Sequence, residues 1–408
     1  MSLTFRCEFT IFIRYFLLIV DFGNHIGFIG TSRLPYCSNF ALVISEYFKR
    51  MKSKTILSAA LVIGGLTARS QDMNNMNKNT SLAPVEKLEL TQEWDKVFPK
   101  SDKVDHSKVV FVNRYGVTLA ADMYKPKGVS GKLPAIAVSG PFGAVKEQSS
   151  GLYAQELAGR GFLTIAFDPS FTGESGGMPR RVASPDINVE DFSAAVDYLV
   201  NRDDVDSEKV GILGICGWGG IAIEAAINDP RIKATVASTM YDMTRVNANG
   251  YFDSENSAEQ RNAKRAAMAA QRSADYRNGM YSRGGGVVDP LPDDAPQFVK
   301  DYHAYYKTPR GYHVRSGNSN DGWNVTSNLP FLNFKFFEYA DELENAVLIV
   351  HGDKAHSYYF GKDTFAMLKG DNKQMLTVKG ASHCDLYDRL DIIPMDEIAA
   401  FYTEYLSK

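Results

Sequence analysis

Short apolar runs alternate with amphipathic stretches along most of this 408-residue chain, and this alternation limits the fold more than any other feature. The segments LPAIAVSG and GFLTIAFD have the length and composition of buried strands. Between such runs, apolar residues repeat at helical spacing, as at Val189, Phe192 and Val196. Strands that alternate with helices predict an α/β protein whose mostly parallel sheet is covered by helices on both faces.

The segment KVVFVNRYGVTLAADMY, which precedes this alternation, has a different pattern. It holds two stretches with strand-like alternation on either side of a turn at residues 113–116. This pattern is typical of a β-hairpin, so we expect an antiparallel pair at the N-terminal edge of the sheet. We assign residues 105–240 and 343–408 to this core.

Residues 241–342 interrupt the alternation. They are rich in Asn, Arg, Tyr and Phe, and an Ala-rich helix is predicted at residues 262–273. Open parallel sheets bind ligands at the carboxyl ends of their strands. We therefore interpret residues 241–342 as a cap inserted over that edge. Its aromatic residues fit either a substrate pocket or a hydrophobic core: Tyr251, Tyr305, Tyr312, Trp323 and Phe331.

The N-terminal part of the chain does not follow the strand and helix pattern. MKSKTILSAALVIGGLTARSQ begins at Met51 and has the basic start, short apolar run and small-residue cleavage site of a secretory signal peptide. We interpret residues 1–50 as an over-extended start, residues 51–70 as the signal peptide, and residues 71–104 as a polar leader. The expected location is the periplasm or the medium.

A membrane anchor at FTIFIRYFLLIV is the alternative for the first residues. Arg14 interrupts this run and Asp21 closes it, so the run is too short and too charged to span a bilayer comfortably. We expect no membrane association after the signal peptide is cleaved.

The distribution of charge and the spacing of glycines argue against nucleic acid and a cofactor as partners. The chain has 45 Lys and Arg against 48 Asp and Glu, a net charge of −3, and the two signs are interspersed. No basic surface for nucleic acid is therefore expected. The glycine-rich stretch GICGWGG lacks the spacing of a dinucleotide or phosphate loop, and we expect no cofactor.

The segment GILGICGWGG carries the strongest chemical signal. An apolar strand leads into Cys216, which has Gly214 two residues before it and Gly217 directly after it. A nucleophile on a sharp strand-to-helix turn needs such glycines, because the strand and the helix pack too closely for side chains. The N-terminus of the following helix also favours the thiolate. We predict that Cys216 is a catalytic nucleophile; a buried core cysteine is the alternative.

A base and an orienting acid would complete the site. His383 follows the last predicted strand and comes after Cys216 in the chain, as the order of a hydrolase triad requires. Asp353, directly after the strand AVLIVHG, is the first choice for the acid, and Asp242 is the fallback. Ala355 occupies the place where such motifs commonly carry the acid. A Cys–His pair can act without one, since a thiol ionises more readily than a hydroxyl.

An oxyanion hole needs backbone N–H groups directed at the developing negative charge. Gly217, directly after the predicted nucleophile, supplies one. The loop SGPFGAVKE should supply the other, and because Pro141 has no N–H, the predicted donor is Phe142.

A metal centre is a competing interpretation of the same region. Its candidate ligands would be His351, Asp353, His356 and His383. His351 ends an apolar strand, and His356 lies in a predicted turn. This spacing disfavours a metal. Asp168 and Glu174 could be drawn as paired acids, but a strand end and a turn explain them better.

The four cysteines reduce to two in the mature protein, because Cys7 and Cys37 precede the predicted cleavage site. Cys216 and Cys384 could form a disulfide or remain thiols. A base that reaches the nucleophile through its side chain keeps the two backbones further apart than a disulfide allows. We predict free thiols, with Cys384 a packing residue.

Taken in order, the hairpin, SGPFGAVKEQ, FDPSFTGESGG, GICGWGG, LIVHGDKAHS and GASHCDLYDR resemble the α/β-hydrolase superfamily over about residues 105–406. Within it, the chain is similar to dienelactone-hydrolase-like and X-Pro-dipeptidyl-peptidase-like bacterial hydrolases. Dienelactone hydrolases use cysteine, histidine and aspartate, so the resemblance implies those roles for Cys216, His383 and Asp353. The strand-to-helix turn at Cys216, which we call the elbow, departs from the common G-x-S-x-G motif only in having cysteine for serine.

The expected function is hydrolysis of an ester, lactone or thioester of a small molecule by acyl transfer through Cys216. A peptidase of the X-Pro type is one alternative. A non-catalytic binding protein on the same fold is another, since a fold alone does not establish activity. The alanine at position 355 favours this last alternative, and the presence of both Cys216 and His383 argues against it.

Overall fold

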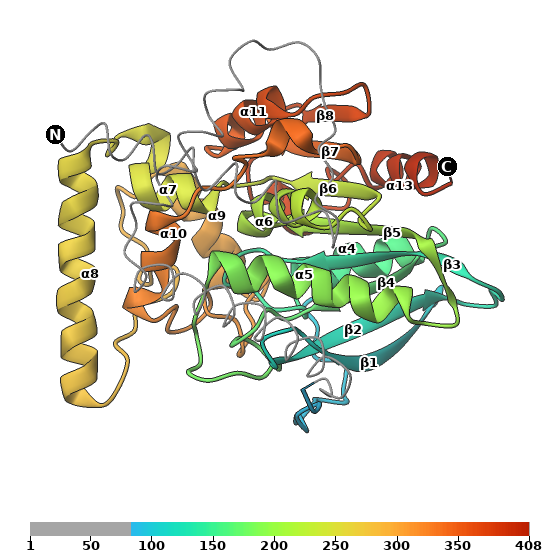
Figure 1. Ribbon diagram of the computed structural model, residues 1–408, viewed down its shortest axis with the longest axis horizontal. Coiled ribbons are helices and arrows are strands. Elements are labelled where there is room, and N and C mark those ends of the chain that lie inside the picture. The colour runs from blue at the N-terminus through green and yellow to red at the C-terminus, as the bar shows by residue number, and fades with distance from the viewer. Residues whose placement is uncertain (1–82, 408) are drawn as a thin grey trace, which may run out of the picture. The chain divides into compact units, whose positions relative to one another are not determined.

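The computed structural model describes residues 83–407, and Figure 1 shows their arrangement. The expected start, the signal peptide and residues 71–82 of the leader lie outside the described residues. Within 83–407, none of the helices combines the length and the apolar character that a membrane span needs.

Eight strands of the described chain form one sheet in the order β1-β2-β4-β3-β5-β6-β7-β8. The pairs β1–β2 and β2–β4 are antiparallel, and the other neighbours are parallel. The predicted mostly parallel sheet with an antiparallel N-terminal edge is therefore confirmed. The strands are β1 (Val104–Val112), β2 (Thr118–Pro126), β3 (Leu133–Ser139), β4 (Leu163–Phe167), β5 (Val205–Ile215), β6 (Ala234–Ser238), β7 (Ala346–Gly352) and β8 (Lys373–Val378).

The N-terminal hairpin turns at the predicted residues. Val112 pairs with Thr118, and the buried Asn113 closes the turn between them. Its side-chain oxygen accepts hydrogen bonds from the backbone N–H groups of Tyr115 and Val117, each at 3.0 Å. An asparagine that bonds to the backbone in this way favours a turn over a continued strand.

Helices cover both faces of the sheet (Figure 1). Those of the core are α4 (Ser149–Ala158), α5 (Pro185–Val200), α6 (Gly217–Asn228), α11 (Tyr358–Met367), the short α12 (Asp385–Asp388) and α13 (Met395–Tyr405). The apolar sides of α5 and α6 pack in one hydrophobic cluster, and those of α4 and α13 pack in a second cluster. Burial of these two apolar surfaces is the main driving force for the layered arrangement.

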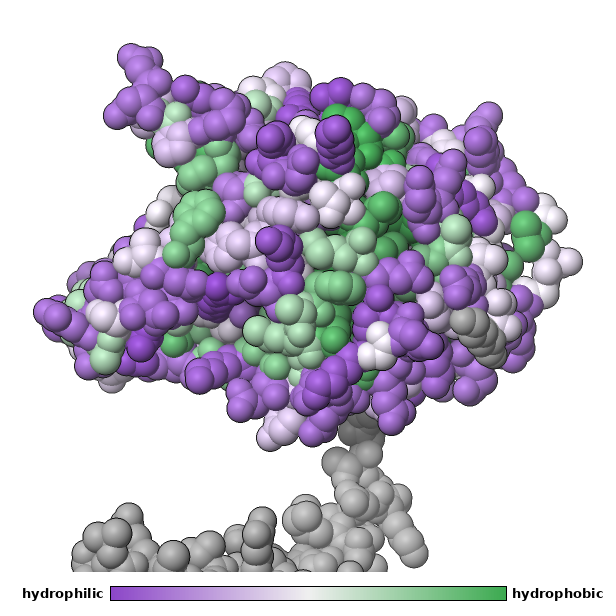
Figure 2. Space-filling model, turned by 90° about the horizontal axis from the view of Figure 1, so that it is seen from above, coloured by the Kyte–Doolittle hydropathy of each residue, from purple (hydrophilic) through white to green (hydrophobic). Residues whose placement is uncertain are grey.

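The segment between β6 and β7 supplies the cap helices. They are α7 (Met243–Asn249), α8 (Ala258–Asn278), α9 (Gln297–Tyr306) and α10 (Leu329–Asn333), with the 3-10 turns η1 (Tyr251–Asp253), η2 (Val325–Asn328) and η3 (Ala340–Glu342). In Figure 1, α7 to α10 gather at one end of the sheet. Figure 2 shows a mainly hydrophilic surface from above, with hydrophobic residues near its centre.

Helix α8 is longer than the predicted helix at residues 262–273. Its N-terminus is extended to Ser257, whose hydroxyl accepts a hydrogen bond from the N–H of Gln260 at 3.1 Å. Gly279 ends the helix in the left-handed conformation, with φ +65°. A capping serine and a C-terminal glycine are ordinary helix boundaries.

Candidate active site

Cys216 occupies a strained turn between β5 and α6. Its φ is +60° and its ψ is −128°, a conformation that residues with a side chain rarely adopt. The N–H of Cys216 donates to the carbonyl of Ser238 at 2.9 Å, and its own carbonyl accepts from Tyr241 at 3.0 Å. These bonds hold the backbone in the strained conformation, and such conformations concentrate at functional sites.

The glycines around Cys216 lie where the chain has no room for side chains. A Cβ at Gly214 would lie 1.9 Å from the carbonyl oxygen of Trp218, and one at Gly220 would lie 2.2 Å from that of Tyr241. The structure therefore supplies the physical reason for the glycine pattern. A larger residue at Gly214 would push helix α6 away from strand β5, and one at Gly220 would push it away from the loop after β6.

The predicted oxyanion donors converge on the sulfur. Hydrogen bonds from the backbone N–H groups of Phe142 and Gly217 lower the pKa of the Cys216 thiol. A Cβ at Gly217 would lie 2.8 Å from that of Phe142, so the two donors sit side by side. The cap holds this loop in place, because the amide of Asn318 donates to the carbonyl of Phe142 at 2.8 Å.

His383 is buried, and the side chain next to its Nε2 is that of Tyr387. That Nε2 is 3.0 Å from the hydroxyl of Tyr387, and a hydrogen bond from that hydroxyl lowers the pKa of the Cys216 thiol. The His383 Nδ1 is 2.9 Å from the hydroxyl of Thr239 and 2.6 Å from that of Ser357. The structure therefore brings Cys216 and His383 together around one phenol.

The structure does not bring a candidate acid to His383. The carboxylate of Asp353 accepts a hydrogen bond from the N–H of Gly380 at 2.7 Å, between β8 and His383. Asp242 caps α7, accepting from the N–H groups of Thr244 and Arg245 at 2.9 Å. Both carboxylates are engaged at turns, and two hydroxyls occupy the Nδ1 side of the imidazole.

The resting pair is uncharged. Burial raises the pKa of the Cys216 thiol, although the hydrogen bonds from Tyr387, Phe142 and Gly217 oppose this effect. Burial also lowers the pKa of His383 to well below its ordinary value, and repulsion from His356 adds to the effect. The expected preference for thiolate at the helix N-terminus is outweighed, because desolvation disfavours both charged forms.

Aromatic residues from the core and the cap enclose the pair. The ring of Tyr241, after β6, lies 5.1 Å from that of His383, and the ring of Tyr302, on α9, lies 5.5 Å from it. The two phenol oxygens are 2.9 Å apart. Helix α9, from the segment between β6 and β7, therefore contributes a ring to the surroundings of His383. Of its five predicted aromatics, Trp323 lies 4.8 Å from the Phe142 ring, Tyr305 and Phe331 are buried, and Tyr251 and Tyr312 are partly exposed.

Two of the candidate metal ligands, His351 and His356, are each engaged by another group through one ring nitrogen. His351 Nε2 lies 3.3 Å from the carbonyl of Met240, and His356 bonds to the hydroxyl of Tyr241. Both histidines have pKa values lowered by burial to about 4.

A buried cluster near the oxyanion loop contains the one set of possible metal ligands found among residues 83–407. These are Glu147, Asp168 and Glu174. The Lys146 ammonium lies 2.7 Å from an oxygen of each carboxylate. Burial lowers the pKa of Lys146, but the surrounding carboxylates outweigh burial and raise it well above its ordinary value. The Lys146 ammonium therefore occupies the position that a metal ion would take between the three carboxylates.

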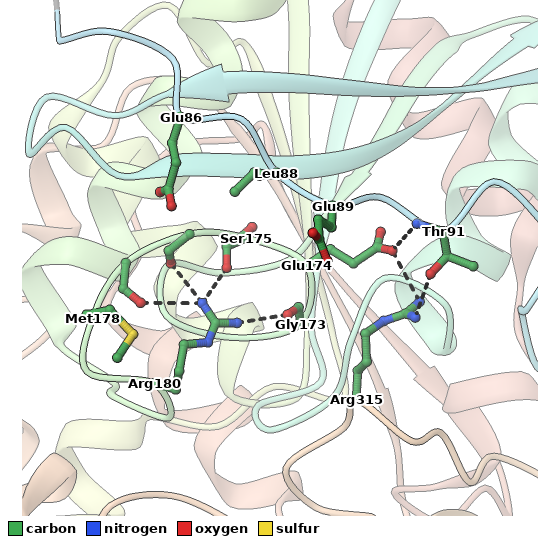
Figure 3. A pocket seen from close by; sticks show the side chains of 12 residues that line it. Glu86, Leu88, Glu89, Thr91, Gly173, Glu174, Ser175, Met178, Arg180 and Arg315 are labelled. Atoms are coloured by element: carbon green, nitrogen blue, oxygen red, sulfur yellow. Dashed lines mark hydrogen bonds and ion pairs between the residues drawn. The ribbon is translucent and has the colours of Figure 1, made fainter.

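A cavity of about 320 Å³ adjoins this cluster and does not include Cys216 or His383 (Figure 3). Its two arginines already have partners. Arg180 donates to backbone carbonyls, including that of Gly173 at 2.8 Å, and Arg315 donates to Thr91 at 3.1 Å. The bond of Arg315 joins Thr91 of the leader to the segment between β6 and β7.

Three residues that contact His383 were not predicted from the sequence: Tyr387, Ser357 and Thr239. Tyr387 lies four residues after His383, a spacing that places two side chains on one side of a helical turn. That spacing could have predicted from the sequence that Tyr387 lies beside His383. Ser357 and Thr239 follow different strands, and their sequences carry no comparable signal.

The chain is similar to proteins of known sequence and structure. It is 51% identical over 369 residues to the uncharacterized protein PA2218 of Pseudomonas aeruginosa, spanning 89% of this chain and 98% of that protein. The crystal structure of PA2218 matches with a TM-score of 0.76 and 54% identity, covering 78% of this chain and 99% of the other. A shorter stretch of 137 residues is 31% identical to the thiohydrolase aneE of Aspergillus aculeatus, covering 34% of this chain and 42% of that protein.

The fold and the family follow from two further matches. The structure of the α/β hydrolase GrgF from Penicillium has a TM-score of 0.61 at 18% identity, covering 74% of this chain and all of the other, which shows a shared fold. The sequence profile of the X-Pro dipeptidyl-peptidase (S15) family matches residues 115–383, from the hairpin turn to the histidine of the site. The chain therefore belongs to the X-Pro dipeptidyl-peptidase (S15) family, within the α/β-hydrolase superfamily.

Proposed function

We propose that this hydrolase cleaves an ester, lactone or thioester by acyl transfer through Cys216. The observation that carries the proposal is the convergence on one sulfur of two backbone N–H groups and of a phenol that contacts His383. A nucleophile, a base and an oxyanion hole are the parts that acyl transfer requires.

In the proposed reaction, Cys216 attacks the acyl carbon and His383 accepts the thiol proton. The carbonyl oxygen becomes an oxyanion that accepts hydrogen bonds from Phe142 and Gly217. The intermediate then expels the alcohol or thiol, which takes a proton from His383. Water gives a proton to His383 and attacks the carbonyl of the thioester on Cys216. The carbon–sulfur bond then breaks, the sulfur takes the proton back from His383, and the acid is released.

The uncharged surroundings favour an activated acyl substrate. The described contacts of His383 are hydroxyls and aromatic rings, and those of the Cys216 sulfur are N–H groups and a phenol. A base with a lowered pKa is weak, so a good leaving group is needed. The thiohydrolase relative makes a thioester our first choice within this class.

A peptidase of the X-Pro type is the second candidate, because the family profile bears that name. Such a substrate would bring a charged amino terminus to the site. An ammonium group needs a carboxylate partner when it is buried, and the described contacts of Cys216 and His383 include none. This argument places the peptidase second.

A substrate panel tests the proposal. It contains p-nitrophenyl esters, a lactone, an acyl N-acetylcysteamine thioester and glycyl-proline p-nitroanilide, and it is assayed before and after iodoacetamide treatment. We expect turnover of an ester or thioester that is lost when Cys216 is alkylated. Exclusive turnover of the anilide would favour the peptidase, and undiminished turnover after complete alkylation of Cys216 would contradict the cysteine mechanism.

We also propose that the protein is exported, on the basis of the signal-peptide pattern that begins at Met51. Mass spectrometry of the protein from its native host should find a mature N-terminus near Gln71 in the periplasm or the medium. Peptides from residues 1–50 would contradict both the predicted start and the cleavage.

A further inference from the structure

Two hydroxyls face the Nδ1 atom of His383. Ser357 Oγ lies 2.6 Å from this nitrogen and Thr239 Oγ1 lies 2.9 Å from it, and both residues are fully buried. Thr239 directly follows β6, and Ser357 lies between β7 and α11. The candidate acids Asp242 and Asp353 belong to the same two segments. Hydroxyls therefore stand at the nitrogen that the acid of a triad would contact.

Ser357 does not use its hydroxyl for the helix that it precedes. It is the N-cap residue of α11, and a serine in this position ordinarily accepts a hydrogen bond from a backbone N–H of the first helical turn. The Ser357 side chain makes no such capping bond. Within residues 83–407, the hydrogen bond of its hydroxyl goes to His383. The position of this hydroxyl is therefore explained by the histidine and not by the helix.

The backbone of Thr239 is strained. Its φ is +43°, in the left-handed region, which a β-branched residue rarely adopts. Its N–H donates to the carbonyl of Val350 on β7 at 2.7 Å, and this bond ties the residue to the neighbouring strand. Such strained conformations concentrate at functional sites. Held in this conformation, Thr239 presents its hydroxyl to His383.

The position of one proton on the imidazole decides whether His383 can act as a base. Its Nδ1 is covered by the two hydroxyls, so Nε2 is the nitrogen on which it can accept a proton. A neutral imidazole that accepts at Nε2 carries its own proton on Nδ1. A buried N–H needs an acceptor, and either hydroxyl oxygen can accept. Without both hydroxyls, the Nδ1 proton has no acceptor among the described side chains, whereas a proton on Nε2 still has the Tyr387 oxygen at 3.0 Å.

This inference rests on the proposed function, which makes His383 the base for Cys216. We propose that Ser357 and Thr239 replace the acid of the triad and hold His383 in the tautomer that carries its proton on Nδ1. As the sulfur–carbon bond forms, the thiol proton moves to Nε2, and the Nδ1 proton stays on the ring and is donated to the hydroxyl oxygens. The hydroxyls gain and lose no proton. Both are positioning residues, because they act through the imidazole.

A pair of hydroxyls differs from a carboxylate in charge. Hydroxyl oxygens orient the imidazole, but they stabilise the imidazolium less than an ionised acid does. A triad with hydroxyls in place of the acid is therefore neutral at rest, and it forms its imidazolium at a higher cost. This property matches the preference for a good leaving group in the proposed function.

A double-mutant cycle tests the positioning role. Nδ1 carries one proton, so one hydroxyl can accept it when the other is lost. Ser357→Ala and Thr239→Val should each lower kcat by no more than about tenfold. The two substitutions together should lower kcat at least about 1000-fold and leave KM within about threefold, because the imidazole then takes the wrong tautomer. A loss no larger than the product of the two single losses would overturn the shared role.

Two controls separate the hydroxyls from packing. The pair Ser357→Ala with Thr239→Ser keeps one hydroxyl at Nδ1, so it should have the kcat of Ser357→Ala alone, within about threefold. Thr235 on β6 is a buried threonine whose hydroxyl has no hydrogen-bond partner among the described residues. Thr235→Val should therefore leave kcat within about twofold. Midpoints of thermal unfolding show whether each variant is folded.

A second measurement does not depend on turnover. Nitrogen-15 magnetic resonance of labelled histidine distinguishes a proton on Nδ1 from one on Nε2, and the signals of His383 are those missing in His383→Gln. Ser357→Ala with Thr239→Val should shift His383 toward the tautomer with its proton on Nε2. Ser357→Ala alone, which loses the shorter contact, should show part of this shift. Unchanged tautomer populations in both variants would overturn the proposal.

The two proposals fail in different ways. Undiminished kcat in the folded variant that lacks both hydroxyls, beside an inactive Cys216→Ala, would reject the positioning role alone. Full activity in Cys216→Ala would reject the proposed function itself.

Discussion

Cys216→Ala is expected to abolish turnover of the acyl substrate and to leave the fold intact. The substitution removes the sulfur on which the Phe142 and Gly217 N–H groups and the Tyr387 hydroxyl converge. We expect kcat to fall by about 10⁴-fold or more, as for the loss of a nucleophile that acts as one unit with its base.

Cys216→Ala should change the free energy of unfolding very little. Alanine occupies the same turn with φ +60° at no greater backbone strain than cysteine, and it removes only one small buried group. Thermal unfolding and near-ultraviolet circular dichroism should therefore match the wild-type protein.

Two matched variants make the result specific. Cys384→Ala removes the other described thiol, which is also buried and free, and it should keep nearly full activity. Cys216→Ser keeps a weaker nucleophile in the same place and should keep a small fraction of activity. Full activity in Cys216→Ala would disprove nucleophilic catalysis by this residue.

Lys146→Met is expected to cost about 3–5 kcal/mol of unfolding free energy, because it leaves buried carboxylates without their central cation. Lys146 is completely buried, and its ammonium lies 2.7 Å from oxygens of Glu147, Asp168 and Glu174. Arg315 and Lys108 still face Glu147 and Glu174 in the variant. Asp168 has no other ion pair among the described residues, so it bears most of the cost.

The effect should depend on pH with a definite sign. Burial raises the pKa of Glu174, but Lys146 and Lys108 outweigh burial and hold it at about 2. That carboxylate thus stabilises the wild-type fold above its unfolded pKa, and the contribution is lost as the pH falls toward 2. Without Lys146 the carboxylates protonate more readily. The stability difference between variant and wild type should therefore be smaller at pH 5 than at pH 7.

Urea denaturation at both pH values measures this prediction. The control is Lys125→Met, which breaks the partly exposed pair of Lys125 with Asp204 at 3.0 Å and should cost less than about 1 kcal/mol. Equal losses in the two variants would contradict the role given to the buried cluster. Activity should also fall in Lys146→Met, since Lys146 lies on the loop that carries Phe142 and its N–H donates to Asp168.

The sequence determined the architecture because the signals for it are local. Apolar runs of strand length, separated by amphipathic helices, bury two faces of one sheet wherever they occur along the chain. The turn at Asn113 and the glycines beside Cys216 also follow from the conformations and close approaches that a few neighbouring residues must make. The hairpin, the parallel sheet and the position of the elbow could therefore be predicted.

Only the tertiary structure decided which groups surround His383. Thr239 and Ser357 are 144 and 26 residues away from it in the chain, and they meet it because three different strands end at the same edge of the sheet. Asp353 had the right place in the sequence, but its carboxylate turns to Gly380. A shift of one or two residues in a turn decides such contacts, and no local pattern encodes it.

The charge of the site was also decided by the tertiary structure. The helix N-terminus at Cys216 is visible in the sequence and favours a thiolate. Burial, which depends on residues far away in the chain, raises the pKa of that thiol and lowers the pKa of His383. Desolvation is a property of the whole fold, and here it outweighs the local effect of the helix.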